Sequence, residues 1–90
     1  MPFQSDDQRL RFIEVLNEEY DWPDYYLFKF IIKTANKSEL LKLLVGYKIE
    51  EKLSRNGNYT SISARALVQS AEEICDIYEK VKVCEGIISL

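Results

Sequence analysis

The pair Asn56-Gly57 constrains the fold of this 90-residue chain more than any other feature of the sequence. Asn-Gly is the preferred pair at the centre of a two-residue hairpin turn, because both central positions of that turn need a positive φ. Alternating polar and apolar residues lie on both sides of the pair, over 47–54 and 58–67. The sequence therefore predicts two neighbouring antiparallel strands joined at this point, and every other element has to be placed around them.

The stretch 25–33 has the composition of a strand, because aromatic and β-branched residues occupy most of its positions. Side chains of a strand alternate between the two faces of a sheet. In this strand the set expected to face the core is Tyr26, Phe28, Phe30 and Ile32. In the hairpin strands the corresponding sets are Tyr47, Ile49 and Leu53 before the turn and Ile62, Ala64 and Ala66 after it.

Helices are predicted on both sides of the hairpin along the chain. The first covers residues 37–46, and its apolar stripe consists of Leu40, Leu41, Leu44 and Val45. The second begins after Ser70, since Ser70 and Glu73 have the spacing of a capping box. Its expected buried stripe consists of Ala71, Ile74, Cys75, Tyr78 and Val81. Residues 86–90 then form a short last strand.

A further amphipathic helix is predicted over residues 6–20. Pro23 ends it, because a proline disfavours helical geometry at the preceding residue. The apolar face of this helix has to be covered. The favoured hypothesis is that the helix packs on its own domain, across one sheet edge or over the open sheet face near Tyr25, Leu27 and Ile31. The alternative is that it docks on a second copy or on a partner.

The predicted order from residue 23 onward is strand, helix, strand, strand, helix, strand. Right-handed crossovers place both helices on the same sheet face, which gives a split β-α-β arrangement. We therefore predict an α+β fold, namely a ferredoxin-like βαββαβ sandwich with a four-stranded antiparallel sheet, two helices on one face and an extra N-terminal helix. The corresponding division of the chain is an N-terminal amphipathic helix extension over 1–22 and a ferredoxin-like domain over 23–90.

The charge balance and the absence of histidine limit the chemistry that this chain can perform. It has 12 Lys and Arg, 15 Asp and Glu, a net charge of −3 and no His. Histidine is the most frequent general base and a common metal ligand, and nucleic-acid binding depends on Lys and Arg that neutralise phosphates. We therefore expect no enzyme, no catalytic residues, no cofactor and no metal site, and nucleic acid is a disfavoured partner.

The two cysteines are expected to differ in environment. Cys75 has the helical spacing of a buried residue and is interpreted as a small core side chain. Cys84 is expected to be more exposed, but a reactive thiol is disfavoured there, because the chain has no His and only Lys80 and Lys82 lie nearby to lower its pKa. The sequence shows no signal peptide and no apolar run of about 20 residues. The expected location is cytoplasmic, with no membrane partner.

Polar side chains on one face of the predicted sheet form the candidate interaction surface. Its residues are Tyr25, Lys29, Tyr59, Ser61, Ser63 and Arg65, and Lys33, Lys48 and Lys52 lie beside them. Such a face could bind an anionic ligand, or an RNA strand whose bases stack on exposed aromatic rings. The plainer interpretation is the solvated side of an antiparallel sheet, where alternation of this kind is expected.

Several segments of the chain are similar to those of a known family. They are Trp22-Pro23, the stretch Tyr26-Leu27-Phe28-Lys29-Phe30-Ile31-Ile32, the stretch Ser54-Arg55-Asn56-Gly57-Asn58-Tyr59-Thr60-Ser61, the helix Ser70 to Lys80 with Ile77-Tyr78, and the tail Glu85-Gly86-Ile87-Ile88-Ser89-Leu90. From Trp22 to Leu90 the chain resembles the YbeD-like family of small bacterial proteins of unknown function. The resemblance implies a ferredoxin-like fold related in shape to ACT domains, and it supplies no catalytic or ligand-binding residues.

Three functional hypotheses follow from these features. The leading one is a non-enzymatic regulatory or adaptor domain that acts through protein–protein contacts, with an unidentified protein, or a second copy in a homodimer, as its partner. The second is an ACT-like sensor of an amino-acid-like or anionic small molecule. The third, which the acidic net charge disfavours, is RNA binding on the open sheet face.

Overall fold

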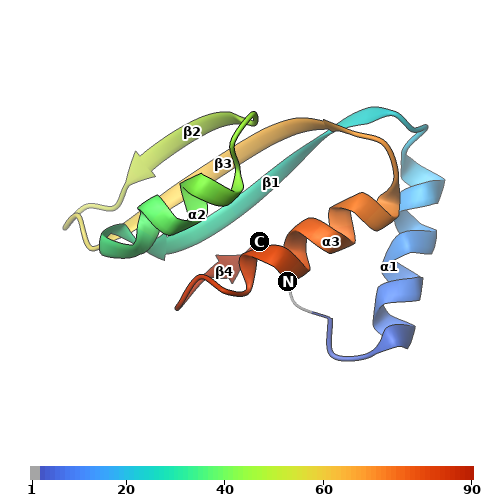
Figure 1. Cartoon of the computed structure of the whole chain (residues 1–90), viewed down its shortest axis with the longest axis horizontal. Coiled ribbons are helices and arrows are strands. Elements are labelled where there is room, and N and C mark those ends of the chain that lie inside the picture. The colour runs from blue at the N-terminus through green and yellow to red at the C-terminus, as the bar shows by residue number, and fades with distance from the viewer. Residues whose placement is uncertain (1–2) are drawn as a thin grey trace.

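The predicted α+β class is confirmed over residues 3–90, which the computed structural model describes. These residues form a four-stranded antiparallel sheet and three α-helices, with a short 3-10 helix (Thr34–Asn36) before the second of them. The elements in chain order, shown in Figure 1, are α1 (Asp6–Glu19), β1 (Asp24–Lys33), α2 (Lys37–Leu43), β2 (Lys48–Leu53), β3 (Tyr59–Val68), α3 (Ala71–Val81) and β4 (Ile88–Ser89).

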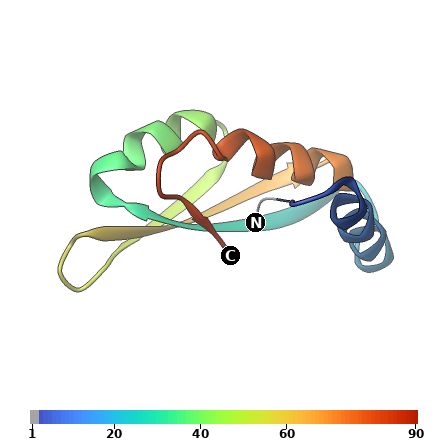
Figure 2. The ribbon, with the colours of Figure 1, turned by 90° about the horizontal axis from the view of Figure 1, so that it is seen from below.

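The strands lie in the order β2-β3-β1-β4. All ten residues of the central strand β1 pair with β3. β2 pairs with β3 on one side, and on the other side β4 pairs with β1 only at Phe30 and Ile31. Figure 2 shows α2 and α3 on the same side of the sheet, as predicted, whereas α1 lies beyond one end of the sheet. The sheet of the described residues therefore has one face covered by helices and one face without them.

The hairpin is confirmed, but its turn differs from the predicted one. The loop between β2 and β3 covers five residues, 54–58, and within it only Gly57 has a positive φ, +77°. The N–H of Gly57 donates to the carbonyl of Ser54 at 3.0 Å. Asn56 acts through its side chain, which accepts hydrogen bonds from the N–H of Asn58 and the hydroxyl of Ser54. A two-residue turn is therefore wrong, because the extra side-chain bonds stabilise a longer loop.

The core lies between the sheet and the helices α2 and α3. Its fully or almost fully buried residues include Phe28, Phe30, Ile32, Ile62, Ala64 and Val68 from the strands, Leu40, Ala71, Ile74, Cys75, Tyr78 and Val81 from the helices, and Leu44 and Cys84 from the segments that follow α2 and α3. The predicted buried stripe of α3 is thus confirmed in full. In the central strands the predicted core-facing sets are confirmed, with Tyr26 and Ala66 half-buried near the end of the sheet.

Two residues predicted to face the core are exposed. Val45 is 80% exposed because α2 ends at Leu43 and the chain turns at Gly46, where φ is +90°. Leu53 is 58% exposed because it is the last residue of an edge strand. The hairpin loop that follows Leu53 extends past α2 in Figure 2, so no helix covers this end of β2.

The helix α1 packs on α3 and not on the open sheet face. A guanidinium nitrogen of Arg9 lies 2.9 Å from a carboxylate oxygen of Asp76 in α3, and the ring centres of Phe12 and Tyr78 are 6.2 Å apart. The expected packing of this helix on its own domain is confirmed. Of the two positions left open for it, the one over the sheet face near Tyr25 is wrong, since the Tyr25 side chain remains 56% exposed.

Leu→Ala substitutions on the covered side and on the uncovered side of the sheet should differ in how much stability they remove. Leu40→Ala, at a fully buried position, should lower the free energy of unfolding by about 2–5 kcal/mol, because it removes apolar contacts and leaves a cavity. Leu27→Ala, at a position that is 51% exposed on the opposite face, should lower it by less than about 1 kcal/mol. Urea denaturation followed by circular dichroism measures both values. Equal losses would mean that both sheet faces are covered.

Three buried ionisable side chains and the half-buried Tyr47 have raised pKa values. Burial raises the pKa of the Cys75 and Cys84 thiols above the ordinary 9.0. It also raises the pKa of the Tyr47 and Tyr78 phenols above 10.0. The Tyr78 hydroxyl lies 3.4 Å from that of Tyr26, and this hydrogen bond raises its pKa further. All four groups are therefore neutral in the folded protein at neutral pH.

These raised pKa values predict a loss of stability at alkaline pH. As the pH rises, the unfolded chain releases the thiol protons first, near pH 9.0, while the folded chain still holds them. The free energy of unfolding should therefore be steady below that pH and fall above it. Urea titrations between neutral pH and about pH 10 measure the slope, and Cys75→Ala/Cys84→Ala should reduce it. An identical slope in the double variant would contradict the assignment to the thiols.

Candidate functional site

The sheet face opposite α2 and α3, called the open face below, carries every residue of the predicted interaction surface. Alternation along paired strands puts directly opposed residues on the same face. The open-face residues are Tyr25, Leu27, Lys29, Ile31 and Lys33 of β1, Tyr59, Ser61, Ser63, Arg65 and Leu67 of β3, Lys48, Glu50 and Lys52 of β2, and Ile88 of β4. The long pairing of β1 with β3 therefore assembles this face from segments far apart in the sequence.

Four of the six predicted residues lie together at one end of the open face. Lys29 lies directly opposite Ser63, and Arg65 is the next residue of β3 on the same face. The guanidinium carbon of Arg65 is 4.8 Å from the centre of the Tyr25 ring, which is a cation–π contact. Tyr25 thus holds the Arg65 head group over the face.

The other two predicted residues, Tyr59 and Ser61, lie toward the hairpin. Tyr59 is the first residue of β3, whereas Tyr25 pairs near the other end of that strand, opposite Leu67. The two tyrosines are therefore not brought together. The middle of the face between them carries aliphatic side chains of β1, including Ile31 opposite Ser61. An aromatic platform of neighbouring rings, as RNA-binding sheets use, is not formed by this pair.

Basic side chains dominate the charge of the open face. Five of its residues are Lys or Arg and one, Glu50, is acidic, so its formal charge is +4. The whole chain carries −3, and the remainder of the molecule therefore carries −7. The ion pairs found within residues 3–90 involve Arg9, Lys37 and Lys82, and none involves a cation of the open face. The face is thus a basic surface on an acidic protein.

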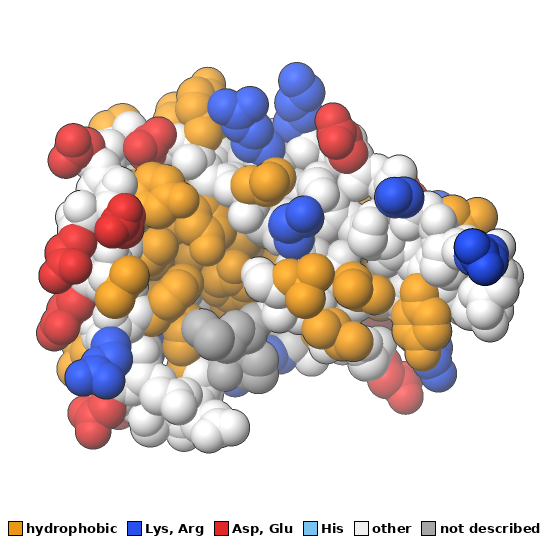
Figure 3. All heavy atoms as spheres, turned by 180° about the vertical axis from the view of Figure 1, so that it is seen from behind, with side chains coloured by type: hydrophobic (Ala, Val, Ile, Leu, Met, Phe, Trp, Pro, Cys, Tyr) orange, Lys and Arg blue, Asp and Glu red, His pale blue; other side chains and the backbone are white. Residues whose placement is uncertain are grey.

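Half-exposed apolar side chains share this face with the cations. They are Tyr25, Leu27, Tyr59, Leu67 and Ile88, each between 42% and 56% exposed. Figure 3 shows this side of the molecule: apolar side chains form a broad patch between α1 and the sheet and continue toward the hairpin. Basic side chains lie along its upper border and toward the hairpin, and acidic ones line the α1 border. Apolar and basic groups therefore meet on one surface.

Sequence reasoning missed part of the apolar side of this surface. Alternation along β1 places Leu27 on this face, but Leu67 of β3 and Ile88 of β4 were not assigned to it. One face of β1 carries apolar residues together with Lys29 and Lys33. This mixture in the sequence indicates a face that is neither buried in the core nor fully polar. Only the register shows that the neighbouring strands continue the same mixture.

A shallow hollow of about 380 Å³ lies on the open face among the cations. Its lining residues are Leu27, Lys29, Lys48, Glu50, Ser63 and Arg65. A smaller hollow of about 190 Å³ lies closer to the hairpin, lined by Ile31, Lys52, Leu53, Ser54, Tyr59 and Ser61. Polar groups converge from three strands only in the first of these two.

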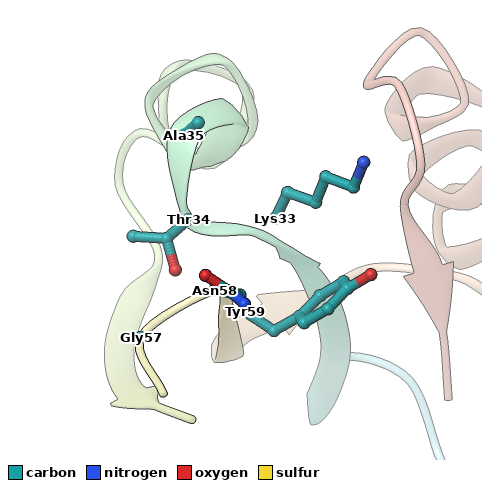
Figure 4. Close-up of a pocket in the computed structure, with 6 residues that line it drawn as sticks. All are labelled: Lys33, Thr34, Ala35, Gly57, Asn58 and Tyr59. Carbon is teal, nitrogen blue, oxygen red and sulfur yellow. The ribbon is translucent and has the colours of Figure 1, made fainter.

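A larger hollow of about 470 Å³ lies at the hairpin end and is lined by Lys33, Thr34, Ala35, Gly57, Asn58 and Tyr59. Figure 4 shows the amine of Lys33 and the phenol of Tyr59 extending away from Thr34 and Ala35. The Thr34 N–H already donates to the Asn58 carbonyl at 2.9 Å, and the Thr34 and Thr60 hydroxyls are 2.9 Å apart. The polar groups of Thr34 are therefore used within the fold, and the Lys33 and Tyr59 side chains do not converge with them on a ligand.

The expectation of an exposed Cys84 is wrong. Cys84 is 1% exposed and belongs to the core cluster, because the chain turns back toward the sheet directly after α3 and its N–H donates to the carbonyl of Val81. Burial raises the pKa of its thiol, which disfavours the thiolate needed for reaction. Cys75 is buried as predicted. Both cysteines are therefore core side chains.

The burial of both thiols predicts that they are protected from reagents. In the native protein at pH 8, Cys75 and Cys84 should react with an aromatic disulfide reagent only as fast as the fold opens. In concentrated urea both should react within the mixing time. The absorbance of the released thiolate counts the groups modified. Immediate modification of a thiol in the native protein would contradict the burial of both groups.

Residues 3–90 hold neither a metal-binding cluster nor a membrane-crossing helix. No three Cys, Asp or Glu side chains lie close enough to hold a metal ion. Over the same residues, no helix has the length and the apolar composition needed to cross a bilayer.

The fold and the open face define a small α+β domain whose sheet has one covered, apolar face and one uncovered, basic face. Residues 17–90 match the family described as "Protein of unknown function (DUF493)", and the chain belongs to this family. The match begins in the last turn of α1 and includes every strand. No curated protein and no solved structure matches the chain.

Proposed function

We propose that this chain is a ferredoxin-like, non-enzymatic regulatory or adaptor domain that binds an acidic, amphipathic segment of a partner protein on its open face. The observation that carries the proposal is the coincidence of half-exposed apolar side chains with unpaired cations on one surface. Large exposed apolar groups gathered on one face are typical of an interaction site. The cations select which partner can approach it.

The charge distribution favours an acidic partner over a second copy of this chain. Two open faces in a symmetric dimer would each bring a formal charge of +4 into contact. Like charges that face each other across an interface reduce the binding free energy by roughly several kcal/mol, which suppresses such pairing. A segment with alternating acidic and apolar side chains would match both the cations and the aliphatic groups. A homodimer, if the chain forms one, is therefore not proposed through this face.

The side-chain types favour a protein over RNA. Bases bind to sheets by stacking on exposed aromatic rings. On the open face one side of the Tyr25 ring lies against Arg65 at 4.8 Å, and Tyr59 lies at the other end of the same face. The aliphatic side chains of Leu27 and Ile31 lie between them and offer apolar contact instead. This arrangement supports a partner that buries Leu, Ile or Phe side chains.

The ferredoxin-like assignment is supported by the way each helix links its strands. α2 connects β1 to β2, which lie on either side of β3, and α3 connects β3 to β4, which lie on either side of β1. Each helix thus spans a split pair, as in the β-α-β-β-α-β motif. A relationship to the YbeD-like proteins and a cytoplasmic location stay predictions from the sequence.

Binding of designed peptides tests the proposal. An amphipathic peptide of Leu and Glu should shift the amide resonances of β1 and β3 in a nuclear magnetic resonance titration, whereas the same peptide with Lys in place of Glu should not. Lys33→Glu/Lys52→Glu should weaken binding by at least about tenfold, since it reverses two charges on the open face. Raising the salt concentration to about 1 M should also weaken it.

A matched control is provided by the helix side. Lys42→Glu/Lys80→Glu makes the same change in net charge at exposed positions of α2 and α3, and it should leave the affinity unchanged. Equal weakening by both double variants would mean that net charge alone drives binding. Equal binding of the acidic and basic peptides would overturn the proposed partner chemistry. Tighter binding of a single-stranded oligonucleotide than of the acidic peptide would favour RNA instead.

A further inference from the structure

Like charges lie directly opposite each other on the open face. The register pairs Lys48 of β2 with Arg65 of β3, and Lys29 of β1 lies on the diagonal from Arg65. Directly opposed like charges in a sheet destabilise it. A stable fold alone gives no reason to bring three cations to one place, and an anion bound between them would relieve their repulsion.

The three cations surround a space that is built from three strands. The hollow of about 380 Å³ is lined by their side chains together with Leu27, Glu50 and Ser63. The Ser63 hydroxyl can donate to an oxyanion. With one carboxylate among three cations, the hollow has a formal charge of +2. A dianion neutralises it, whereas a single carboxylate leaves half of the charge unmatched.

Arg65 is positioned for this role by its neighbour. Its guanidinium carbon lies 4.8 Å from the centre of the Tyr25 ring, so the cation is held over an aromatic face. A guanidinium in such a contact still has N–H donors that can bind two oxygens of one phosphate. Lys29 and Lys48 add point charges on two sides of it.

We propose that this hollow is a subsite for a phosphoryl group on a side chain of the acidic partner segment. The inference rests on the proposed function for the source of the phosphoryl group, but the site itself can be tested without the partner. A phosphoryl dianion supplies the two charges and the several acceptor oxygens that the hollow matches. Phosphorylation of the partner would then strengthen its docking on this face.

Two other lysines of the same face provide the control. Lys52 lies opposite Ser61, and Lys33 lies opposite Tyr59, so neither opposes a cation. Neither lines the hollow. Lys29→Gln/Lys48→Gln and Lys33→Gln/Lys52→Gln therefore remove the same residue types and the same charge from one face, and only the first pair removes it from the hollow.

The first experiment uses inorganic phosphate as the probe, at constant ionic strength against chloride. Phosphate should shift the amide resonances of Lys29, Lys48, Ser63 and Arg65 with saturation, and chloride should not. Lys29→Gln/Lys48→Gln should abolish the saturable shifts, while Lys33→Gln/Lys52→Gln retains them. Circular dichroism of both variants confirms that each is folded. Identical responses to phosphate and chloride, or loss of the shifts in both variants, would overturn the site.

The second experiment compares the Leu and Glu peptide carrying one serine with the same peptide carrying phosphoserine. The phosphorylated form should bind about tenfold more tightly to the native sequence, since charge-assisted hydrogen bonds are added. The ratio of the two affinities should fall to about one in Lys29→Gln/Lys48→Gln and persist in Lys33→Gln/Lys52→Gln. Equal affinities of the two peptides for the unaltered protein would contradict the phosphoryl subsite and leave the proposed function intact.

The two proposals can fail separately. If neither peptide binds and phosphate still shifts the amide resonances of the residues that line the hollow, the proposed protein partner is wrong. The site then takes a free phosphate-bearing small molecule. That outcome also overturns the partner as the source of the phosphoryl group. If an oligonucleotide binds more tightly than the phosphoserine peptide and the hollow variant abolishes this binding, the phosphoryl group comes from a nucleic acid, and the protein source is again overturned.

Discussion

The pairing of β1 with β3 along ten residues is the constraint on which the rest of this structure depends. Because side chains alternate, one register decides both faces of the sheet at once. It places Phe28, Phe30 and Ile62 under the helices, and by the same geometry it places Lys29, Ser63 and Arg65 on the opposite side. A slip of one residue would bury the cations and expose the aromatic core, so the register of the core also fixes the candidate site.

The two faces of the sheet have opposite effects on the stability of the fold. The covered face provides stability, since its side chains are almost completely removed from water between the sheet and the helices. The open face lowers stability, because it holds the opposed pair Lys48 and Arg65 and several half-exposed apolar groups. Natural proteins tend to break local rules of this kind at functional sites. The proposed partner would offset this loss of stability in two ways. Its apolar side chains would cover the half-exposed apolar groups, and its phosphoryl group would neutralise the opposed cations.

Local features of the fold could be predicted from the sequence, whereas features set by distant contacts could not. The strand over 25–33 and the Ser70 cap, whose hydroxyl accepts from the N–H of Glu73, depend on neighbouring residues. The exposure of Leu53 depends on where the helices end over the sheet, and the burial of Cys84 depends on how the chain returns after α3. The six candidate residues and Leu27 could be placed on one face by alternation, but the position of Ile88 beside them required the register.

The most direct test of an uncovered, basic face is its solvent accessibility in the isolated protein. A neutral and an anionic paramagnetic probe can be compared by their relaxation effects on the methyl groups of Leu27, Leu67 and Ile88, at a concentration where light scattering gives the monomer mass. We predict strong effects at these methyls, larger for the anionic probe, and weak effects at Leu40 and Ile74. Protection of the first three methyls in the monomer would show that the face is covered, and the central claim would be wrong.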